Sequence, residues 1–370
     1  MKDLKVYFPN LNGLRFIAAL LVIIHHIEQI KYLFNMPNYY MTIPFVSVIG
    51  KLGVVLFFVL SGFLITYLLL HEEHIYQKIS IKKFYIRRVL RIWPLYFLII
   101  TLGFCVFPNV NSFAVPNVSN AQIFEDLPIK LALFLFFLPN MVLSIYGAIP
   151  YVSHSWSIGT EEQYYLVWPL IFSYFKKNRI LVMVVIILFY LIVNYFLKSE
   201  FVSNLSFGVI LKKFWASFSI DCMAIGGLLA ICLYQENRFN KIILNNTLFY
   251  SVLFITIILI FNGVHFSSFH YEIYAILFGI IIVNFAANKN IAISLENGYL
   301  NYLGNISYGL YMYHPIGIVA SLIITKAINQ TTNWLIYPIS IIITILLAGI
   351  SYKYFEAYFL KFKKKYSKLG

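Results

Sequence analysis

Arg15 and His26 stand out because both lie in one apolar segment, LNGLRFIAALLVIIHHIEQI, residues 11–30. Ionisable groups are costly inside such a helix, and those that occur there often have a function. Eleven positions make about three helical turns, so both side chains project from nearly one face, about 16 Å apart along the axis. His25 points about 100° away from His26, so the two histidines cannot face one site. The alternative is that Arg15 extends to the membrane surface and His26 packs against a polar partner.

A second candidate is the arginine pair in FYIRRVLRIWPLY, residues 84–96. Arg88 and Arg91 are three residues apart, so on a helix they face the same way. Their planar guanidinium groups suit the oxygens of a polyanionic phosphate. Anchoring to lipid headgroups explains the neighbouring Arg87 well and stays open as the alternative for this pair.

Two adjacent carboxylates, Glu161 and Glu162, occur in SHSWSIGTEEQYYLVWP, residues 153–169. With Trp156 they combine an aromatic belt with acidic groups that could orient a histidine or a sugar hydroxyl. We predict that they lie level with His26, in the outer third of the membrane. The alternative is a pair of carboxylates hydrated at the membrane surface.

Two further apolar segments carry polar or small residues. Ser61 precedes Gly62 in GKLGVVLFFVLSGFLITYLLL, where small residues allow a ligand or, more commonly, another helix to approach the backbone. Tyr308, Tyr311 and His314 follow one another at three-residue steps along one helical stripe. Such a stripe lines either a cavity or a seam between helices.

These residues are embedded in a chain with 61% hydrophobic and 11% charged residues, far more apolar than a soluble domain. We predict one all-α polytopic membrane domain over residues 1–370, without an appended soluble domain. About ten stretches are long enough, or nearly so, to cross a bilayer: 11–30, 52–70, 91–107, 163–175, 180–197, 214–234, 246–262, 271–287, 303–325 and 334–356. The run 131–146 is interrupted by Pro139 and Asn140, so we predict an interfacial or re-entrant element there.

The basic residues indicate the orientation. With ten crossings, the Lys- and Arg-rich segments 78–91, 176–179 and 361–368 fall on one side, which predicts a multi-pass protein of the inner (cytoplasmic) membrane with both termini cytoplasmic. Orientation therefore accounts for the net charge of +14, and a nucleic-acid partner is not expected. The three cysteines lack metal-binding spacing, so we expect them to pack in the core and no metal to bind.

Five blocks of this chain resemble, in order and approximate spacing, the membrane-bound acyltransferase 3 family, integral-membrane O-acyltransferases that modify bacterial surface glycans. They are NLNGLRFIAALLVIIHH, GVVLFFVLSGFLIT, FYIRRVLRIWPLY, WSIGTEEQYYLVWPL and ISYGLYMYHPI. The resemblance extends from Asn10 to about Glu356. Ile158 and Tyr164 stand where leucine and phenylalanine are frequent in the family, and neither change affects the expected chemistry. Some relatives carry an added extracytoplasmic hydrolase-like domain. We expect no such domain in this chain, and we therefore expect it to act alone or with a separate partner.

The resemblance implies transfer of an acyl group, most often acetyl, from cytoplasmic acyl-CoA to a hydroxyl of a surface glycan or a lipid-linked sugar. His26 matches the essential histidine of the family, and we expect it to act as a general base oriented by Glu161 or Glu162. Transient acylation of His26 is the other possible mechanism. The donor is expected to contact Arg15, Arg88 and Arg91. The substrate-binding residues are predicted to be Ser61, Trp156, Tyr308, Tyr311 and His314.

A transporter or flippase for a glycan or lipid-linked substrate is the competing interpretation, since such proteins also keep charged residues within the membrane. Transporters commonly contain internal repeats or paired broken helices, and this sequence shows neither. A sensor or scaffold would not need both a group of arginines for phosphate and a second group formed by His26 and the two glutamates. The acyl group, the acceptor and the oligomeric state stay open.

Overall fold

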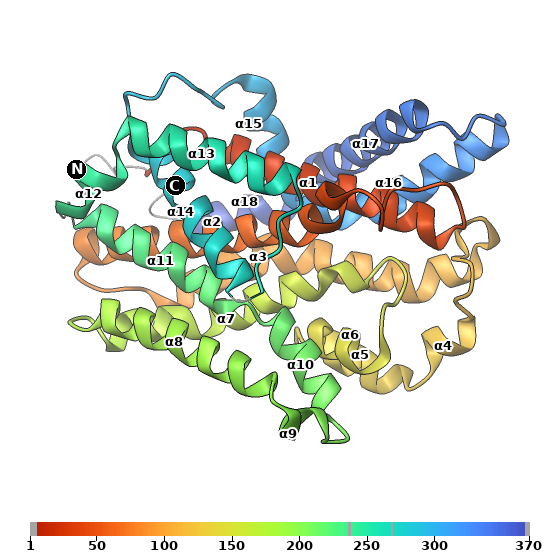
Figure 1. Cartoon of the computed structure of the whole chain (residues 1–370), viewed down its shortest axis with the longest axis horizontal. Coiled ribbons are helices and arrows are strands. Elements are labelled where there is room, and N and C mark those ends of the chain that lie inside the picture. Colours follow the sequence, from red (N-terminus) through yellow and green to blue (C-terminus); the bar gives the residue numbers. More distant parts are fainter. Residues whose placement is uncertain (1–5, 236–237, 268, 367–370) are drawn as a thin grey trace.

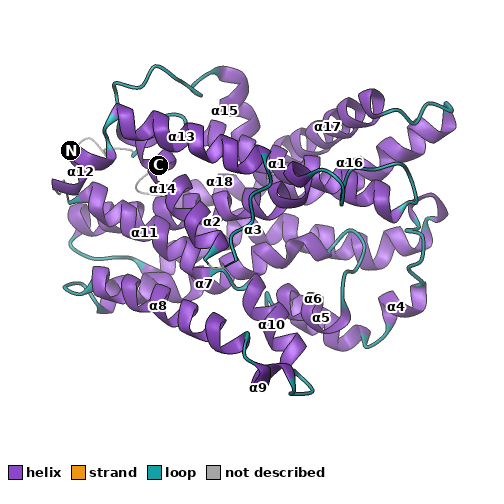
Figure 2. Cartoon of the chain, in the orientation of Figure 1, coloured by secondary structure: helices purple, strands orange, loops and turns teal. Residues whose placement is uncertain are grey.

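The computed structural model describes residues 6–235, 238–267 and 269–366. Within these ranges the regular structure is helical throughout, as the sequence predicts (Figure 2). The terminal residues 1–5 and 367–370, for which a cytoplasmic location is predicted, lie outside the described ranges. The described part therefore has the architecture of an all-α protein.

The helices run as follows along the chain. The first half contains α1 (Leu11–Leu33), α2 (Pro44–Tyr76), α3 (Ile81–Thr101), α4 (Asn120–Phe124), α5 (Leu127–Leu135), α6 (Pro139–Tyr146), α7 (Trp156–Tyr174) and α8 (Arg179–Leu197). The second half contains α9 (Glu200–Ser203), α10 (Gly208–Ser217), α11 (Ile220–Tyr234), α12 (Arg238–Ile243), α13 (Asn246–Phe261), α14 (His270–Ala287), α15 (Gly298–Asn305), α16 (Ser307–Ala327), α17 (Asn333–Ile350) and α18 (Ala357–Tyr366). Short π-helices follow α3 (Leu102–Val106) and α17 (Ser351–Glu356).

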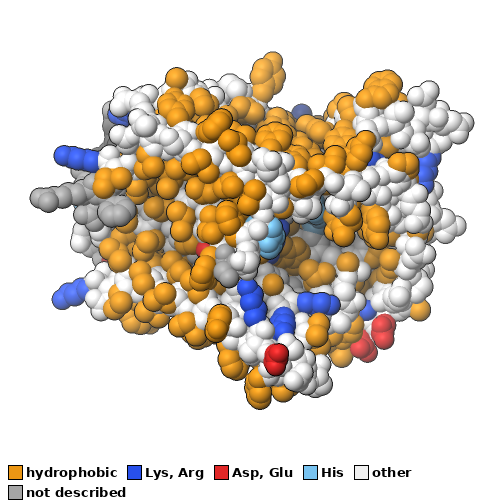
Figure 3. Space-filling model, in the orientation of Figure 1, with side chains coloured by type: hydrophobic (Ala, Val, Ile, Leu, Met, Phe, Trp, Pro, Cys, Tyr) orange, Lys and Arg blue, Asp and Glu red, His pale blue; other side chains and the backbone are white. Residues whose placement is uncertain are grey.

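Eight helical segments in the described ranges are long and apolar enough to cross a membrane. They are Leu11–Leu33, Pro44–Tyr76, Ile81–Asn109, Arg179–Leu197, Gly208–Tyr234, His270–Ala287, Ser307–Ala327 and Asn333–Lys363. The other two predicted stretches are also helical, but α13 has only 16 residues, and α7 carries Glu161, Glu162 and Gln163 in its first half. Hydrophobic side chains cover much of the face seen in Figure 3, and a hollow near its centre has histidine side chains at its edge. The protein is thus an all-α polytopic membrane protein.

The run 131–146 does not form a spanning helix. It divides between α5 and α6, of nine and eight residues, whereas a crossing needs about 20. Phe137 between them has a positive φ of 57°, and Pro139 begins α6, where its missing N–H is not needed. Asn140 is buried and accepts a hydrogen bond of 3.1 Å from Gln163 Nε2 on α7. The two residues that interrupt the run therefore begin a helix that packs on α7.

The centre of the bundle is the contact between α2 and α11, which lie side by side (Figure 1). A Cβ atom added to Gly62 would meet the carbonyl oxygen of Met223 at 1.9 Å, and one added to Gly226 would meet that of Val59 at 2.2 Å. The two backbones are therefore in direct contact. Close helix packing explains Gly62, as the commoner interpretation of this motif predicts.

A buried polar cluster fixes the C-terminal end of α1. Lys31 Nζ lies 2.7 Å from both Glu28 Oε1 and Asn333 Oδ1, and the Tyr337 hydroxyl donates to Glu28 Oε1 at 2.8 Å. Glu28 and Lys31 are almost fully buried, so losing either partner would leave an uncompensated charge. These contacts tie α1 to α17 and hold His26, one half turn before Glu28, in a fixed orientation.

We expect Gly62→Ala to destabilise the protein by about 1–3 kcal/mol, because the added methyl group must push α2 and α11 apart. Thermal unfolding of the detergent-purified protein measures this as a lower melting temperature. Gly298→Ala is the matched control, since a Cβ atom there meets nothing within 4 Å. Equal melting temperatures for the two variants would show that the two helices do not need this close contact.

Candidate active site

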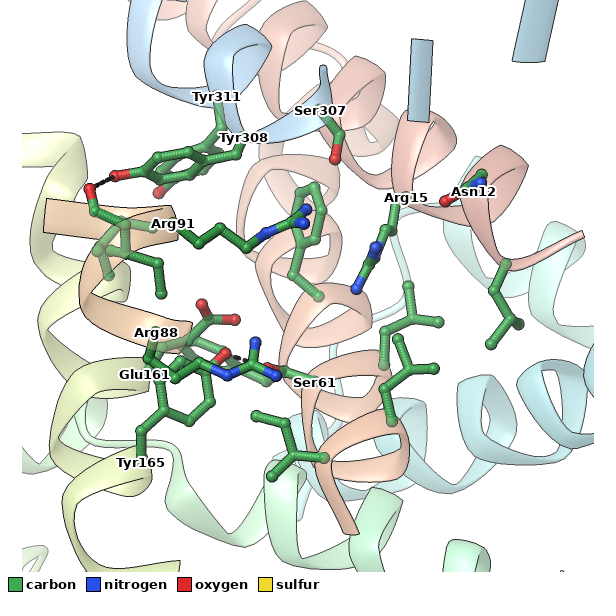
Figure 4. A pocket seen from close by; sticks show the side chains of 18 of the residues that line it. Asn12, Arg15, Ser61, Arg88, Arg91, Glu161, Tyr165, Ser307, Tyr308 and Tyr311 are labelled. Atoms are coloured by element: carbon green, nitrogen blue, oxygen red, sulfur yellow. Dashed lines mark hydrogen bonds between the residues drawn. The ribbon is translucent and has the colours of Figure 1, made fainter. Parts of the chain in front are cut away.

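Two cavities lie among the described helices, and most of the sequence-predicted residues divide between them. The first cavity is lined by positive side chains from three separate elements. It has a volume of about 300 Å³ and is bordered by Arg15 of α1, Arg88 and Arg91 of α3, and Lys363 of α18. Glu161 of α7 is the one acidic side chain that lines it. Figure 4 shows the guanidinium groups of Arg15 and Arg91 directed into the space between α1 and α3, with that of Arg88 beside Ser61. The structure therefore brings together all three predicted donor-binding arginines.

Aromatic rings hold Arg88 in place. Its guanidinium carbon lies 5.3 Å from the ring centre of Tyr165 and 5.5 Å from that of Phe84. The Tyr165 hydroxyl is hydrogen-bonded to Ser61 Oγ, so the predicted Ser61 contributes to the same wall. Arg88 Nε is buried and has no hydrogen-bond partner within the described part of the chain. This donor is thus free to bind a ligand oxygen.

The two tyrosines of the α16 stripe close the cavity on one side. The Tyr308 hydroxyl donates to the Ile92 carbonyl at 2.8 Å, and the Tyr311 hydroxyl donates to the His154 carbonyl at 2.7 Å. Because the Tyr311 proton is used in this way, Ser157 Oγ must donate in its 2.7 Å hydrogen bond to the Tyr311 oxygen. Tyr311 therefore joins the first cavity to the backbone of His154.

The second cavity, of about 260 Å³, contains His26. His154, Trp156 and Gln29 also line it, together with residues 148–151 that precede α7. Arg15 lines only the first cavity, so the two ionisable residues of α1 serve different cavities. Their separation of about 16 Å along one helix agrees with this placement.

Three imidazoles form a cluster beside the second cavity. The ring centre of His314 lies 4.7 Å from that of His26 and 5.0 Å from that of His154. His26 Nδ1 lies 2.9 Å from the Val22 carbonyl, and His314 Nδ1 lies 2.6 Å from the Tyr311 carbonyl. A carbonyl oxygen can only accept, so each Nδ1 carries the hydrogen and each Nε2 keeps a lone pair. His314 Nε2 is buried without a partner among the described residues.

His25 faces another direction, as predicted. Its Nδ1 lies 2.7 Å from the Val46 carbonyl, and its ring occupies the space beside Gly50. It does not line either cavity. The helical angle of about 100° between neighbouring residues therefore correctly predicts that His25 and His26 face different surroundings.

The predicted contact between His26 and the two glutamates is wrong. Glu161 lines the arginine cavity, and Glu162 Oε2 accepts a hydrogen bond of 2.9 Å from Trp93 Nε1. The physical reason is the direction of α7, which begins at Trp156 beside the second cavity and runs toward the arginines. Glu161 is five residues further on, about 7.5 Å along the axis. Glu161 thus lies at the cavity of the arginines and Glu162 on Trp93, while His26 lies at the other cavity.

Sequence reasoning missed His154, Ser157, Tyr165 and Lys363. The first three belong to the same block as Trp156 and Glu161, and a helical wheel begun at Trp156 would have put Ser157, Glu161 and Tyr165 on one stripe, four residues apart. Lys363 lies in the basic segment 361–368, whose charge indicates only the orientation of the chain in the membrane. No local pattern connects it with the arginines.

The two cavities suit different chemistry. Four cationic side chains and one carboxylate around the first cavity favour a polyanionic ligand. The lone pair on His26 Nε2 at the second cavity can accept a proton from a ligand hydroxyl. The histidine cluster does not form a metal site, and no group of three or more ligating side chains suited to a metal occurs elsewhere in the described ranges.

Comparison with known proteins shows the family to which the chain belongs. The chain is similar to the O-acetyltransferase OatA of Staphylococcus aureus strains NCTC 8325, COL and MRSA252, with 27% identity over an alignment of 386 residues that covers 95% of this chain. The chain spans 57% of the length of these relatives. No solved structure matches it. Residues 8–353 match the family model described as an acyltransferase domain, so the chain belongs to the acyltransferase 3 family.

Proposed function

We propose that this protein transfers an acetyl group from cytoplasmic acetyl-CoA to a hydroxyl of a surface glycan or lipid-linked sugar. The observation that carries the proposal is the pair of cavities, one lined by arginines and one containing His26, with Tyr311 and His154 between them. The similarity to an O-acetyltransferase supports the acetyl group and the oxygen acceptor. In this proposal the protein lies in the inner membrane with both termini in the cytoplasm.

The arginine cavity is the donor site. Coenzyme A carries several negative charges on its phosphates, and Arg88 and Arg91 can each bind phosphate oxygens through two N–H groups. Val6 and Tyr7 border this cavity, so it lies next to the first described residues of the chain. The flexible arm of the donor then extends along α1, past Arg15 and toward Tyr311.

The histidine cavity is the acceptor site. His26 Nε2 takes the proton from the acceptor hydroxyl, and the hydroxyl oxygen attacks the thioester carbonyl carbon. The carbon–sulfur bond breaks, and the leaving thiolate takes the proton back from His26, so that the products are the ester and the thiol of coenzyme A. The hydrogen bond from His26 Nδ1 to the Val22 carbonyl keeps Nε2 unprotonated before the reaction.

The glutamates act at the donor site in this proposal. Glu161 offsets part of the positive charge of the arginine cavity and lies next to Arg88 in Figure 4. Glu162 holds Trp93 of α3 against α7 through the hydrogen bond to the indole nitrogen. Both residues therefore position the arginines of α3, and His26 is oriented by a backbone carbonyl.

We expect the Arg88→Lys, Arg91→Lys double variant to raise the acetyl-CoA concentration needed for half-maximal activity about tenfold or more, because lysine loses the planar fork that binds two oxygens. Acetyl transfer by the protein in membrane vesicles measures this. The control, Lys82→Gln, removes a full charge from the exposed face of α3. If the control had the larger effect, the arginines would serve only to anchor the helix to lipid headgroups.

We expect His26→Ala to lower the transfer rate by a factor of about 10² to 10⁴, the usual contribution of a general base. Its affinity for coenzyme A should stay normal, since His26 does not line the donor cavity. His25→Ala is the matched control and should keep more activity. Full activity of His26→Ala would exclude both direct base catalysis and acylation of this residue.

The two mechanisms differ in one observable. Direct transfer predicts that purified protein incubated with radiolabelled acetyl-CoA, without acceptor, stays unlabelled. Acylation of His26 predicts a stoichiometric label that passes to the acceptor when it is added and that is absent in His26→Ala. Detection of that label would replace the general-base mechanism.

A further inference from the structure

The last described helix contributes to the donor cavity. Lys363 of α18 lines it together with Arg15, Arg88 and Arg91, although it comes from the opposite end of the chain. A lysine near the end of a spanning helix usually extends to the membrane surface. Lys361 is exposed in this way, whereas Lys363, two residues and about 200° further around the helix, faces the cavity.

Arg87 of α3 makes one contact to α18 and is itself held by a second contact, to Glu72 of α2. Arg87 Nη1 donates to the Tyr366 carbonyl at 3.2 Å, and Arg87 Nη2 lies 3.1 Å from Glu72 Oε2. The other oxygen of Glu72 accepts a hydrogen bond of 3.0 Å from the Ser80 backbone at the start of α3. Arg87, next to Arg88 in the sequence, therefore holds α18 in the position where Lys363 lines the cavity.

A π-helix leads into α18. Its wide turns over Ser351–Glu356 shift the register of the residues that follow. Ser351 Oγ donates to Glu356 Oε1 at 3.2 Å, and both residues are buried. Such insertions in a helix are frequent at functional sites. This one lies directly before the segment that covers the donor cavity.

The charge of the cavity explains why a fourth cation is brought there. Four positive side chains face one carboxylate in the same cavity, and like charges repel more strongly between protein walls than at a fully solvated surface. A polyanionic ligand removes this repulsion. We propose that Lys363 binds the phosphate groups of the donor together with the arginine pair. This inference rests on the donor site proposed above.

Equilibrium binding of coenzyme A to the detergent-purified full chain tests the proposal. We expect Lys363→Gln to weaken binding about tenfold or more, Lys363→Arg to restore most of it, and Lys361→Gln to bind as the wild type does. Raising the salt concentration should weaken binding less in Lys363→Gln than in the wild type, because one charge pair fewer is screened. Melting temperatures without ligand should be similar, which shows that α18 stays folded.

The outcomes separate this inference from the donor site itself. Weak binding by the Arg88→Lys, Arg91→Lys variant with normal binding by Lys363→Gln would overturn the role of Lys363 and leave the donor site in place. Equal losses in Lys361→Gln and Lys363→Gln would also overturn it, since any charge on α18 would then suffice. If the wild type does not bind coenzyme A, both the donor site and this inference are wrong.

Discussion

The arrangement of this protein depends on keeping several guanidinium groups inside a bundle of membrane helices. Arg15, Arg88 and Arg91 converge on one cavity that Glu161 alone among its lining side chains can neutralise. Removing such charges from water is costly unless they are paired or reach a water-filled space. The aromatic rings of Phe84 and Tyr165 against Arg88 reduce this cost without cancelling the charge. The cavity is thus ready for an anion.

The rest of the fold keeps this charged cavity at a fixed distance from His26. Both sites use α1, and a rigid helix sets their separation at about 16 Å. The Gly62 contact brings α2 against α11 without side chains between them, and the cluster around Lys31 ties the C-terminal end of α1 to α17. The first contact is between two helix backbones and the second is between buried side chains. Because such contacts are tightly packed, the two cavities cannot shift independently along the bundle.

Local periodicity was enough to predict part of the site. The faces of Arg88 and Arg91 on α3, of His26 against His25 on α1, and of the Tyr308 and Tyr311 stripe follow from 3.6 residues per turn. The predicted contact between Glu161 and His26 failed because it depends on where α7 begins along its axis. The starting point of α7 at Trp156 decides how far Glu161 lies from His26, and sequence alone does not fix that point within one turn.

Tertiary placement explains the other differences. Lys363 reaches the arginines only because Arg87 and the π-helix before α18 set its position, and neither leaves a pattern near residue 363. The composition of the apolar stretch 163–175 predicts a span, whereas the helix that contains residues 163–174 of it begins seven residues earlier, with polar residues that line the cavities. The polar side chains in its first half make α7 less apolar than a simple membrane span.

The wall between the cavities determines how the chemistry can occur. In the proposed reaction the donor carbonyl and the acceptor hydroxyl must come into contact, whereas Tyr311 lies between the two cavities and is bound to Ser157 and to the His154 carbonyl. These two residues lie just before and within the first turn of α7, whose second turn carries Glu161. A shift of Tyr311 that opens the wall must therefore break contacts to the same segment that borders both cavities.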